Sequence, residues 1–282
     1  MSLVDTLKRA LSEPRNDEML HFSQHLQHDR HTAIYMEYGY PTVDQPWGRI
    51  FPLVQGTGVH ESIHATMAKL YQPYVAERPI KAKDKRLEFE WTGTADAYVS
   101  IDNVVYLLDY KTISGAGMSF LEHEPKPEHV LQVSAYYHFG PTQDCQPAVL
   151  YLPSSPDYRK KWSEPRFIPF EPIGLDTLVR RMREVEEAIW DYKEHRELPE
   201  PPAGEWAWKK RGKLYKLEYR PHYTTMFCPW ASLSDDPCGC SQAKPITAGT
   251  YKEGTLTIDD EYAIIVEKIG VPDEAEETFP EV

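Results

Sequence analysis

Residues 94–111, with the sequence TADAYVSIDNVVYLLDYK, decide the fold of this chain. Two apolar runs flank the dipeptide Asp102-Asn103, which favours a tight turn, so the stretch predicts a β-hairpin. The second strand of the hairpin carries Asp109 and Lys111 at its end. Side chains two residues apart on a strand point to the same side, so we expect this aspartate and this lysine to face one site.

The sequence around the hairpin alternates between helical and extended patterns. Helices are predicted from Gly56 to a point before Pro79 and over residues 128–139 and 171–197, and strands over residues 87–91 and 147–153. Residues 35–55 are rich in proline and aromatic residues and predict an ordered loop. This order favours an α/β fold in which a mixed central β-sheet is flanked by helices.

Composition divides the chain into four segments. Residues 1–50 predict a helical N-terminal segment, residues 51–198 a core with a closing helix, residues 199–246 a basic, aromatic and cysteine-rich segment, and residues 247–282 a C-terminal extension with an acidic tail. The proline-rich run LPEPPAG at 198–204 is the expected linker between the second and third segments.

Charge and hydropathy limit the functions open to the chain. Its 282 residues are 41% apolar and 27% charged, which predicts a folded protein rather than a disordered one. The sequence has no membrane-length apolar run and begins without the apolar stretch of a signal peptide, so we expect a cytoplasmic protein with no membrane partner. A net charge of −13 repels nucleic acid at long range, so a nucleic-acid site here requires a locally basic surface.

A second carboxylate lies one strand before Asp109. The run GTAD at residues 93–96 begins the first strand of the hairpin, so Asp96 is expected across from the Asp109 end of the second strand. Two carboxylates suit a hard divalent cation such as Mg²⁺. A lysine beside them can orient a water or offset the charge of a phosphate. Each of these residues alone is more typical of an ordinary strand end, and it is their combination that indicates a site.

Two predicted helices supply further polar groups to the same site. His60, at the start of the helix that begins at Gly56, offers an imidazole ligand. Gln132 and Tyr136 are four residues apart on a helix and therefore project from one face. An amide and a phenol there can hold phosphate oxygens or the lysine of the site.

This set of motifs resembles the RecB-like branch of the PD-(D/E)xK nuclease superfamily, especially the Cas4-like phage exonucleases. The family motifs G-x-x-x-H, G-x-x-D, D/E-x-K and Q-x-x-x-Y stand here as Gly56 to His60, Gly93 to Asp96, Asp109 to Lys111 and Gln132 to Tyr136. The resemblance covers residues 50–155 and implies a restriction-endonuclease-like core.

The resemblance also implies an activity. It assigns Mg²⁺ or Mn²⁺ to His60, Asp96, Asp109 and the Tyr110 carbonyl, water activation to Lys111, and support of the DNA backbone or of the lysine to Gln132 and Tyr136. The implied enzyme is an exonuclease that hydrolyses DNA phosphodiesters at ends or in single strands. Its implied setting is recombination, repair or CRISPR-type processing, with protein partners from those pathways, in a bacterial cell or a phage-infected host.

Two alternatives stay open. The run His60-Glu61-Ser62-Ile63-His64 matches the H-E-x-x-H signature of zinc metalloproteases, in which the two histidines bind zinc and the glutamate polarises water. This short motif leaves the Asp-x-Lys and Gln-x-x-x-Tyr patterns unexplained. The other alternative is a DNA-binding relative of the nucleases that has lost catalysis.

Three of the four cysteines, Cys228, Cys238 and Cys240, lie within thirteen residues, which favours metal ligands over disulfides in a cytoplasmic chain. Cas4-like nucleases commonly hold an iron–sulfur cluster, so the resemblance implies [4Fe-4S] here, although no cysteine precedes Cys145 and the spacing is unusual. The fourth ligand is either Cys145 or, in a Zn²⁺ site, His222.

Two basic stretches are candidate DNA contacts, because cations can meet phosphates while neighbouring aromatic rings stack on bases. Their members are Lys81, Lys83, Lys85 and Arg86 in the first, and Lys209, Lys210, Arg211 and Lys213, interleaved with tryptophans and a tyrosine, in the second. The same pattern also fits a solvated surface.

Overall fold

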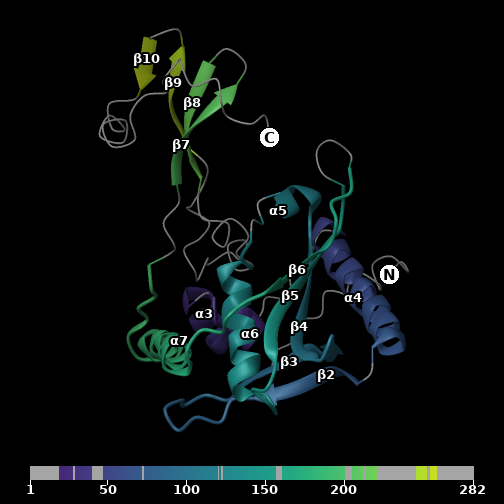
Figure 1. The fold of residues 1–282 in the computed structure, drawn as a ribbon. Helices are drawn as coiled ribbons and strands as arrows, with labels where there is room; N and C mark the ends of the chain where they lie inside the picture. The colour runs from purple at the N-terminus through teal and green to yellow at the C-terminus, as the bar shows by residue number, and fades with distance from the viewer. Residues whose placement is uncertain are drawn as a thin grey trace, which may run out of the picture. The chain divides into compact units, whose positions relative to one another are not determined.

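The strands β3 (Trp91–Ile101) and β4 (Val104–Ile113) form the predicted hairpin, with a register that runs from Ala97↔Leu108 to Ile101↔Val104. Both turn residues between the strands have positive φ, 50° at Asp102 and 65° at Asn103, as the tight turns of hairpins require. The hairpin lies at the centre of the first of two compact units (Figure 1).

The structure is a computed structural model of the whole chain. It describes residues 19–27, 29–39, 47–71, 73–119, 121, 123–156, 161–200, 205–211, 214–220, 246–252 and 255–258. The chain divides into the units Met1–Leu198 and Pro199–Val282, and the division falls in the proline-rich run at 198–204.

The first unit is a mixed α/β structure, as predicted. Its other strands are β1 (Leu20–His21), β2 (Tyr74–Lys81), β5 (Gln146–Pro153) and β6 (Arg166–Pro169). Its helices are α2 (Phe22–His25), α3 (Asp29–Tyr38), α4 (Trp47–Leu70), α5 (Gly115–Ser119), α6 (Pro127–Phe139) and α7 (Leu175–His195). Strand β5 runs parallel to β4, whereas β2 pairs antiparallel with β3 and β6 with β5, so the sheet is mixed.

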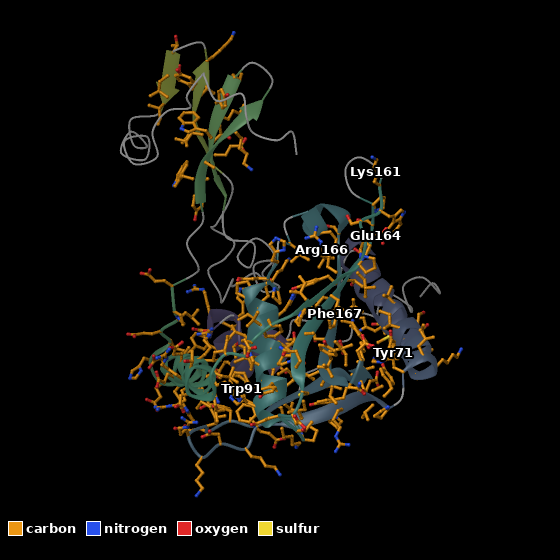
Figure 2. The ribbon with its side chains drawn as sticks, viewed as in Figure 1. Tyr71, Trp91, Lys161, Glu164, Arg166 and Phe167 are labelled. Atoms are coloured by element: carbon orange, nitrogen blue, oxygen red, sulfur yellow. The ribbon has the colours of Figure 1, made fainter. Side chains whose placement is uncertain are left out.

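Helices cover both faces of this sheet (Figure 1). On one face, Ile63 and Met67 of α4 pack against a small cluster around Val99 and Tyr110. On the other face, α6 and α7 cover the larger apolar cluster, which includes the fully buried Trp91 (Figure 2). Functional side chains of the central strands are therefore enclosed between helices on either side.

Several local predictions were wrong. The expected loop at 35–55 overlaps α3 and the start of α4, which begins at Trp47 rather than at Gly56. Helix α4 ends at Leu70, and the residues before Pro79 form the edge strand β2 instead. Residues 82–90 are irregular rather than extended, although Leu87 and Phe89 still pack on the core. Burial of their side chains produced the alternating pattern without a strand.

The second unit contains a four-stranded antiparallel sheet in the described residues, which the sequence reading did not predict. Its strands, in the order β10-β9-β8-β7, are β7 (Glu205–Arg211), β8 (Leu214–Arg220), β9 (Ile246–Lys252) and β10 (Thr255–Ile258). Trp206 lies next to Tyr219, and Trp208 next to Tyr251, so aromatic rings share one face of this sheet. In the part of the chain that the structure describes, no helix is both long and apolar enough to cross a membrane.

A buried carboxylate fixes α7 to the start of β3. Glu186 is 3% exposed and accepts hydrogen bonds from the backbone of Glu88 and Phe89, both at 3.1 Å, and from the indole of Trp91 at 2.8 Å. These three donors would be left without an acceptor if the carboxylate were removed. Charged hydrogen bonds of this kind are worth more than neutral ones.

We expect Glu186→Leu to lower the free energy of unfolding by about 3 kcal/mol, because it leaves buried donors unpaired. Urea denaturation followed by tryptophan fluorescence measures the change. The matched control is Glu194→Leu on the exposed side of the same helix, for which we expect a change within about 0.5 kcal/mol. Equal effects of the two substitutions would contradict the role of Glu186.

Candidate functional site

An interruption in strand pairing creates the site. Thr92 pairs with β2 through Lys81 and with β1 through His21, so β1 lies on the edge of β3 opposite β2. Strand β4 occupies that same edge, but its register with β3 begins only at Ala97. Residues 93–96, the predicted G-x-x-D motif, therefore have β2 on one side and a gap between β1 and β4 on the other.

Side chains fill this gap. The carboxylate of Asp96 accepts the backbone N–H of Tyr110 at 2.6 Å, in place of a strand carbonyl. The hydroxyl of Tyr136, on α6, forms a hydrogen bond with the backbone of Thr94. A backbone group deprived of its strand partner requires such a substitute when it is buried. The motif residues Asp96 and Tyr136 thus support the fold at the same point where they form the site.

Gly93 is required by close packing. A Cβ at this position would lie 2.7 Å from the Phe22 ring and 2.7 Å from the Tyr136 ring, well inside contact distance. Any larger residue would displace the tyrosine that bridges the gap. Packing against these two rings therefore explains why the G-x-x-D motif has a glycine at this position.

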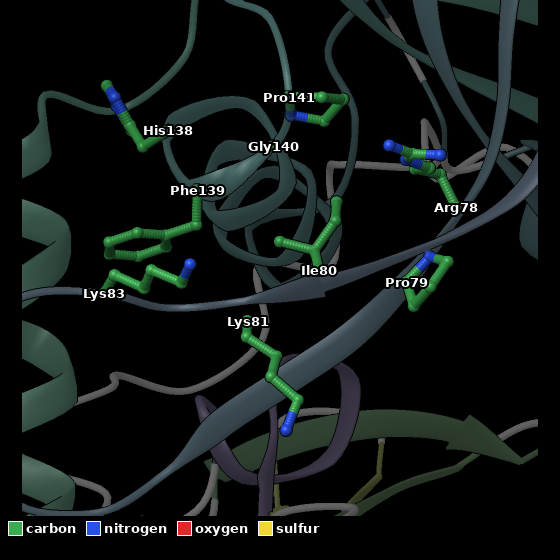
Figure 3. A pocket seen from close by; sticks show the side chains of 9 residues that line it. All are labelled: Arg78, Pro79, Ile80, Lys81, Lys83, His138, Phe139, Gly140 and Pro141. Carbon is green, nitrogen blue, oxygen red and sulfur yellow. The ribbon is translucent and has the colours of Figure 1, made fainter.

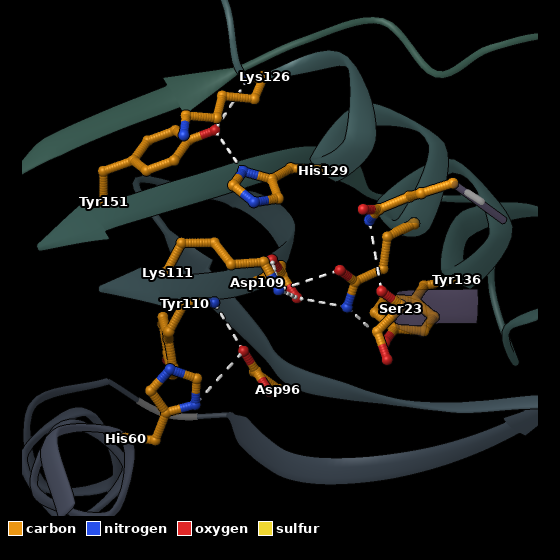
Figure 4. A network of polar contacts seen from close by, with 12 residues as sticks. Ser23, His60, Asp96, Asp109, Tyr110, Lys111, Lys126, His129, Tyr136 and Tyr151 are labelled. Atoms are coloured by element: carbon orange, nitrogen blue, oxygen red, sulfur yellow. Dashed lines mark hydrogen bonds and ion pairs between the residues drawn. The ribbon is translucent and has the colours of Figure 1, made fainter. Parts of the chain in front are cut away.

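Lys111 lies at the centre of a polar network (Figure 4). Its ammonium is 2.9 Å and 3.2 Å from the two oxygens of Asp109 and donates to the amide oxygen of Gln132 at 3.0 Å. The nitrogen of that amide donates to Asp109 at 3.1 Å and to Tyr136 at 2.7 Å. Because a lysine only donates, the amide oxygen must face it, and the orientation of Gln132 is fixed.

His60 approaches the same point from α4. Its Nδ1 is 3.9 Å from Asp96 Oδ2 (Figure 4). Its ring also forms a hydrogen bond with the backbone of Tyr110. The structure therefore brings together all six predicted catalytic side chains, from two strands and two helices, with the backbone of Tyr110 between them.

The two carboxylates are held close together with one cation. Burial, and then the negative charge of Asp109, raise the pKa of Asp96 to about 7. Burial lowers the pKa of His60 and favours the neutral imidazole, the form that can bind a metal ion. Repulsion between two neighbouring carboxylates opposes their ionisation, so a further cation that binds between them stabilises the ionised pair.

The donors fit Mg²⁺ or Mn²⁺ in chemistry. Carboxylate and carbonyl oxygens with an imidazole suit these ions. Asp109 Oδ2 is buried and forms an ion pair with Lys111, and within the described part of the chain it accepts no hydrogen bond of good geometry. Among the described residues, no three His, Cys, Asp or Glu side chains are grouped closely enough to hold an ion: Asp96 lies beside His60, and Asp109 is paired with Lys111.

The H-E-x-x-H pattern places its residues differently. His64 Nδ1 is hydrogen-bonded to the Tyr74 hydroxyl, and Glu61 is exposed on α4. Both histidine rings pack against the ring of Tyr110. The distance between ring centroids is 5.8 Å for His60 and 5.3 Å for His64. The carboxylate beside His60 is that of Asp96, so this histidine belongs with the strand carboxylates rather than with Glu61.

Of the predicted structural-metal ligands, His222, Cys228, Cys238 and Cys240 lie outside the described residues. Cys145 is in the first unit, where its thiol donates to the Thr142 carbonyl at 3.6 Å. Burial, and then the charge of Asp144, raise the pKa of Cys145 to about 11. This environment favours the neutral thiol over the thiolate that binds metal.

The first basic stretch is divided between ion pairs and a pocket. Lys81 pairs with Glu90, and Arg86 pairs with Asp84 at 2.7 Å and Asp176 at 2.8 Å. Lys83 lines a pocket of about 430 Å³ between β2 and the end of α6, and Lys81 lines it as well (Figure 3). Arg78, which the sequence reading missed, lines the same pocket. Lys85 is exposed.

In the second basic stretch, Lys209 of β7 lies directly opposite Lys216 of β8. The side chains of Lys210 and Arg211, and the whole of Lys213, lie outside the described part of the structure. The side chains of Lys209 and Lys216 therefore project from the same face of the sheet.

Sequence reasoning also missed two residues that border the site. His129 lies three residues before Gln132, so both project from the same face of α6. Tyr151 pairs with Lys111 in the β4–β5 register. The spacing of His129 was visible in the sequence, whereas the position of Tyr151 required the strand register.

Comparisons with known proteins do not assign a function to this chain. No family model matches the chain, and no curated protein matches it. Among solved structures, the crystal structure of SSO0001 is similar with a TM-score of 0.46 and 14% sequence identity, over 66% of this chain and 83% of that chain.

The raised pKa of Asp96 predicts a pH-dependent stability in metal-free protein. The folded state holds the Asp96 proton up to about pH 7, whereas the unfolded chain releases it near its ordinary value of 3.8, so stability falls as the pH rises between these two values. Asp96→Asn lacks this penalty. We compare the melting temperature of Asp96→Asn with that of the wild type in EDTA. We expect the difference, variant minus wild type, to be larger at about pH 8 than at about pH 4, by roughly 3–6 °C.

Addition of Mg²⁺ at the higher pH should raise the melting temperature of the wild type and leave that of Asp96→Asn unchanged. Differential scanning calorimetry measures both effects. If the difference in melting temperature between the two proteins stays constant across the pH range, the pKa of Asp96 is not raised in the folded state.

Proposed function

We propose that this chain is a metal-dependent deoxyribonuclease with a restriction-endonuclease-like core, of the RecB-like and Cas4-like type, that degrades DNA from ends or in single strands. The proposed reaction is hydrolysis of a phosphodiester, in which a water oxygen bonds to phosphorus and the P–O bond to the leaving oxygen breaks. DNA recombination, repair or CRISPR-type processing is the proposed setting.

The single observation that carries the proposal is the convergence of four separate motifs on the gap in β3. A chance Asp-x-Lys triplet would have no reason to meet a glutamine from α6. Here Gln132 binds both Asp109 and Lys111, while Tyr136 binds Gln132 and the strand that carries Asp96. Tertiary structure has joined residues that the sequence keeps far apart.

Lys111 is the group that acts on the reacting atoms. An ammonium has three donors, and the contacts to Asp109 and Gln132 engage two of them. Its side chain is 22% exposed, so the third donor can reach a phosphate oxygen or the attacking water. Gln132 and the buried Asp109 keep the ammonium in place and restrict its motion.

Asp96, Asp109, His60 and the Tyr110 carbonyl would hold the divalent cation. When bound, Mg²⁺ or Mn²⁺ supplies positive charge for the phosphate and lowers the pKa of a bound water. The protein residues have two further roles: His60 stays neutral through burial, and Asp96 keeps the Tyr110 backbone in position.

The acidic net charge is compatible with DNA binding because the basic residues are grouped. Arg78 and Lys83 share one pocket on the β2 edge, next to the strand that carries Asp96. Phosphates of a DNA strand bound there would meet two cations close to the site.

Incubation of the purified full chain with end-labelled single- and double-stranded DNA in Mg²⁺, Mn²⁺ or EDTA tests the activity. We expect metal-dependent degradation, and for Lys111→Ala a loss of about 10³-fold or more in kcat/KM with DNA binding retained. The matched control is Lys69→Ala, an exposed lysine on α4 that should leave the rate unchanged.

The outcomes separate the candidate functions. DNA binding without cleavage by folded, metal-loaded wild-type protein would indicate a catalytically inactive relative. Peptide hydrolysis that is lost in Glu61→Gln and retained in Lys111→Ala would indicate a zinc protease. Degradation that is unaffected by the Lys111 substitution would show that this site is not where cleavage occurs.

The pocket cations predict a second effect. We expect the double substitution Arg78→Ala and Lys83→Ala to weaken DNA binding about 3- to 10-fold at low salt and to reduce the salt slope by about 2, because two phosphate contacts are lost. Fluorescence anisotropy in Ca²⁺ at several salt concentrations measures both quantities. Lys69→Ala is the control, because this exposed lysine of α4 does not line the pocket, and an equal loss in both variants would contradict the assignment.

A further inference from the structure

Two further side chains, those of Tyr151 and His129, lie beside the polar network of Lys111 and Gln132. In the β4–β5 register Lys111 pairs directly with Tyr151, so both side chains project from the same face of the sheet. The hydroxyl of Tyr151 lies 2.7 Å from His129 Nδ1, and His129 is one helical turn before Gln132 on α6. Figure 4 shows His129 between Tyr151 and Lys111.

The hydrogen bonds of Tyr151 fix the tautomer of His129. Tyr151 is fully buried, and its oxygen accepts the backbone N–H of Lys126 at 3.0 Å. A buried phenol proton needs an acceptor, and His129 Nδ1 is the acceptor in the described structure. Nδ1 therefore carries no proton, and the neutral ring carries its proton on Nε2.

We propose that His129 is a phosphate-binding residue of this site, whose Nε2–H donates a hydrogen bond to a non-bridging oxygen of the DNA phosphate that Lys111 contacts. This inference rests on the proposed nuclease function. It adds an uncharged donor, held in place by Tyr151, to the four motifs of the family pattern.

The surroundings keep this donor neutral. Burial, and then the positive charges of Lys111 and Lys126, lower the pKa of His129 to about 3. A charged imidazole would add a further cation next to Lys111, whereas a neutral one supplies a directed N–H without that repulsion. The half-buried ring has its Nδ1 side against Tyr151, and in this proposal its Nε2 side meets the phosphate.

The test uses two amide substitutions that differ in length. His129→Asn keeps a side-chain oxygen that can accept from Tyr151 but lacks a group at the Nε2 position, whereas the amide nitrogen of His129→Gln reaches about that position. Thermal melting confirms that both variants fold. We expect His129→Asn to lower kcat/KM about 10- to 100-fold and His129→Gln to retain most of the activity.

Oligonucleotides that each carry one methylphosphonate, at successive positions from the end, identify the contacted phosphate. At one position the methyl substitution should lower the rate of the wild type by a similar factor and have little further effect on His129→Asn, because the two changes remove the same hydrogen bond. The same series in Ca²⁺ measures binding alone. A purely structural role of His129 would give additive losses at every position and would overturn the proposal.

The tautomer is measured independently of activity. Nitrogen-15 chemical shifts of His129 in the metal-free protein should show Nε2–H in the wild type, and an Nδ1–H signal would overturn the proposal.

If the wild type binds DNA without cutting it, and the methylphosphonate coupling persists in binding, the nuclease function fails while the phosphate contact stands. If the wild type does not bind DNA at all, both fail.

Discussion

The gap in β3 between β1 and β4 is the constraint on which the rest of this structure depends. Backbone groups in the middle of a buried sheet need partners, and at residues 93–96 one edge has no neighbouring strand among the residues that the structure describes. The chain supplies side chains instead, with the Asp96 carboxylate on the Tyr110 amide and the Tyr136 hydroxyl on Thr94. The side chains that fill the gap are the same ones that form the polar site.

The packing around the gap explains why the motif residues occur together. Gly93 allows the rings of Phe22 and Tyr136 to approach the strand, and Tyr136 in turn binds Gln132, which holds Lys111. Each residue of this series depends on the one before it. Substitution of a residue that supports the fold at this point therefore also disturbs the site.

Electrostatics and packing are coupled at the same place. Two aspartates share a largely enclosed space with a single ammonium, and the pKa of Asp96 is raised because its charge is opposed by burial and by Asp109. Such an arrangement is unfavourable for stability in the absence of a ligand. It is a typical arrangement where a protein maintains a site for cations or phosphates rather than a well-paired core.

The sequence by itself determined the hairpin, the helices α6 and α7, the mixed α/β class and the identity of the candidate site residues, because strand and helix periodicity and short motifs are local properties. It did not determine β2, the early start of α4 at Trp47, or the sheet of the second unit, where packing overrides local propensity. The gap in β3 and the place of Tyr151 beside Lys111 were decided only by the tertiary structure, since both depend on the register between strands distant in sequence.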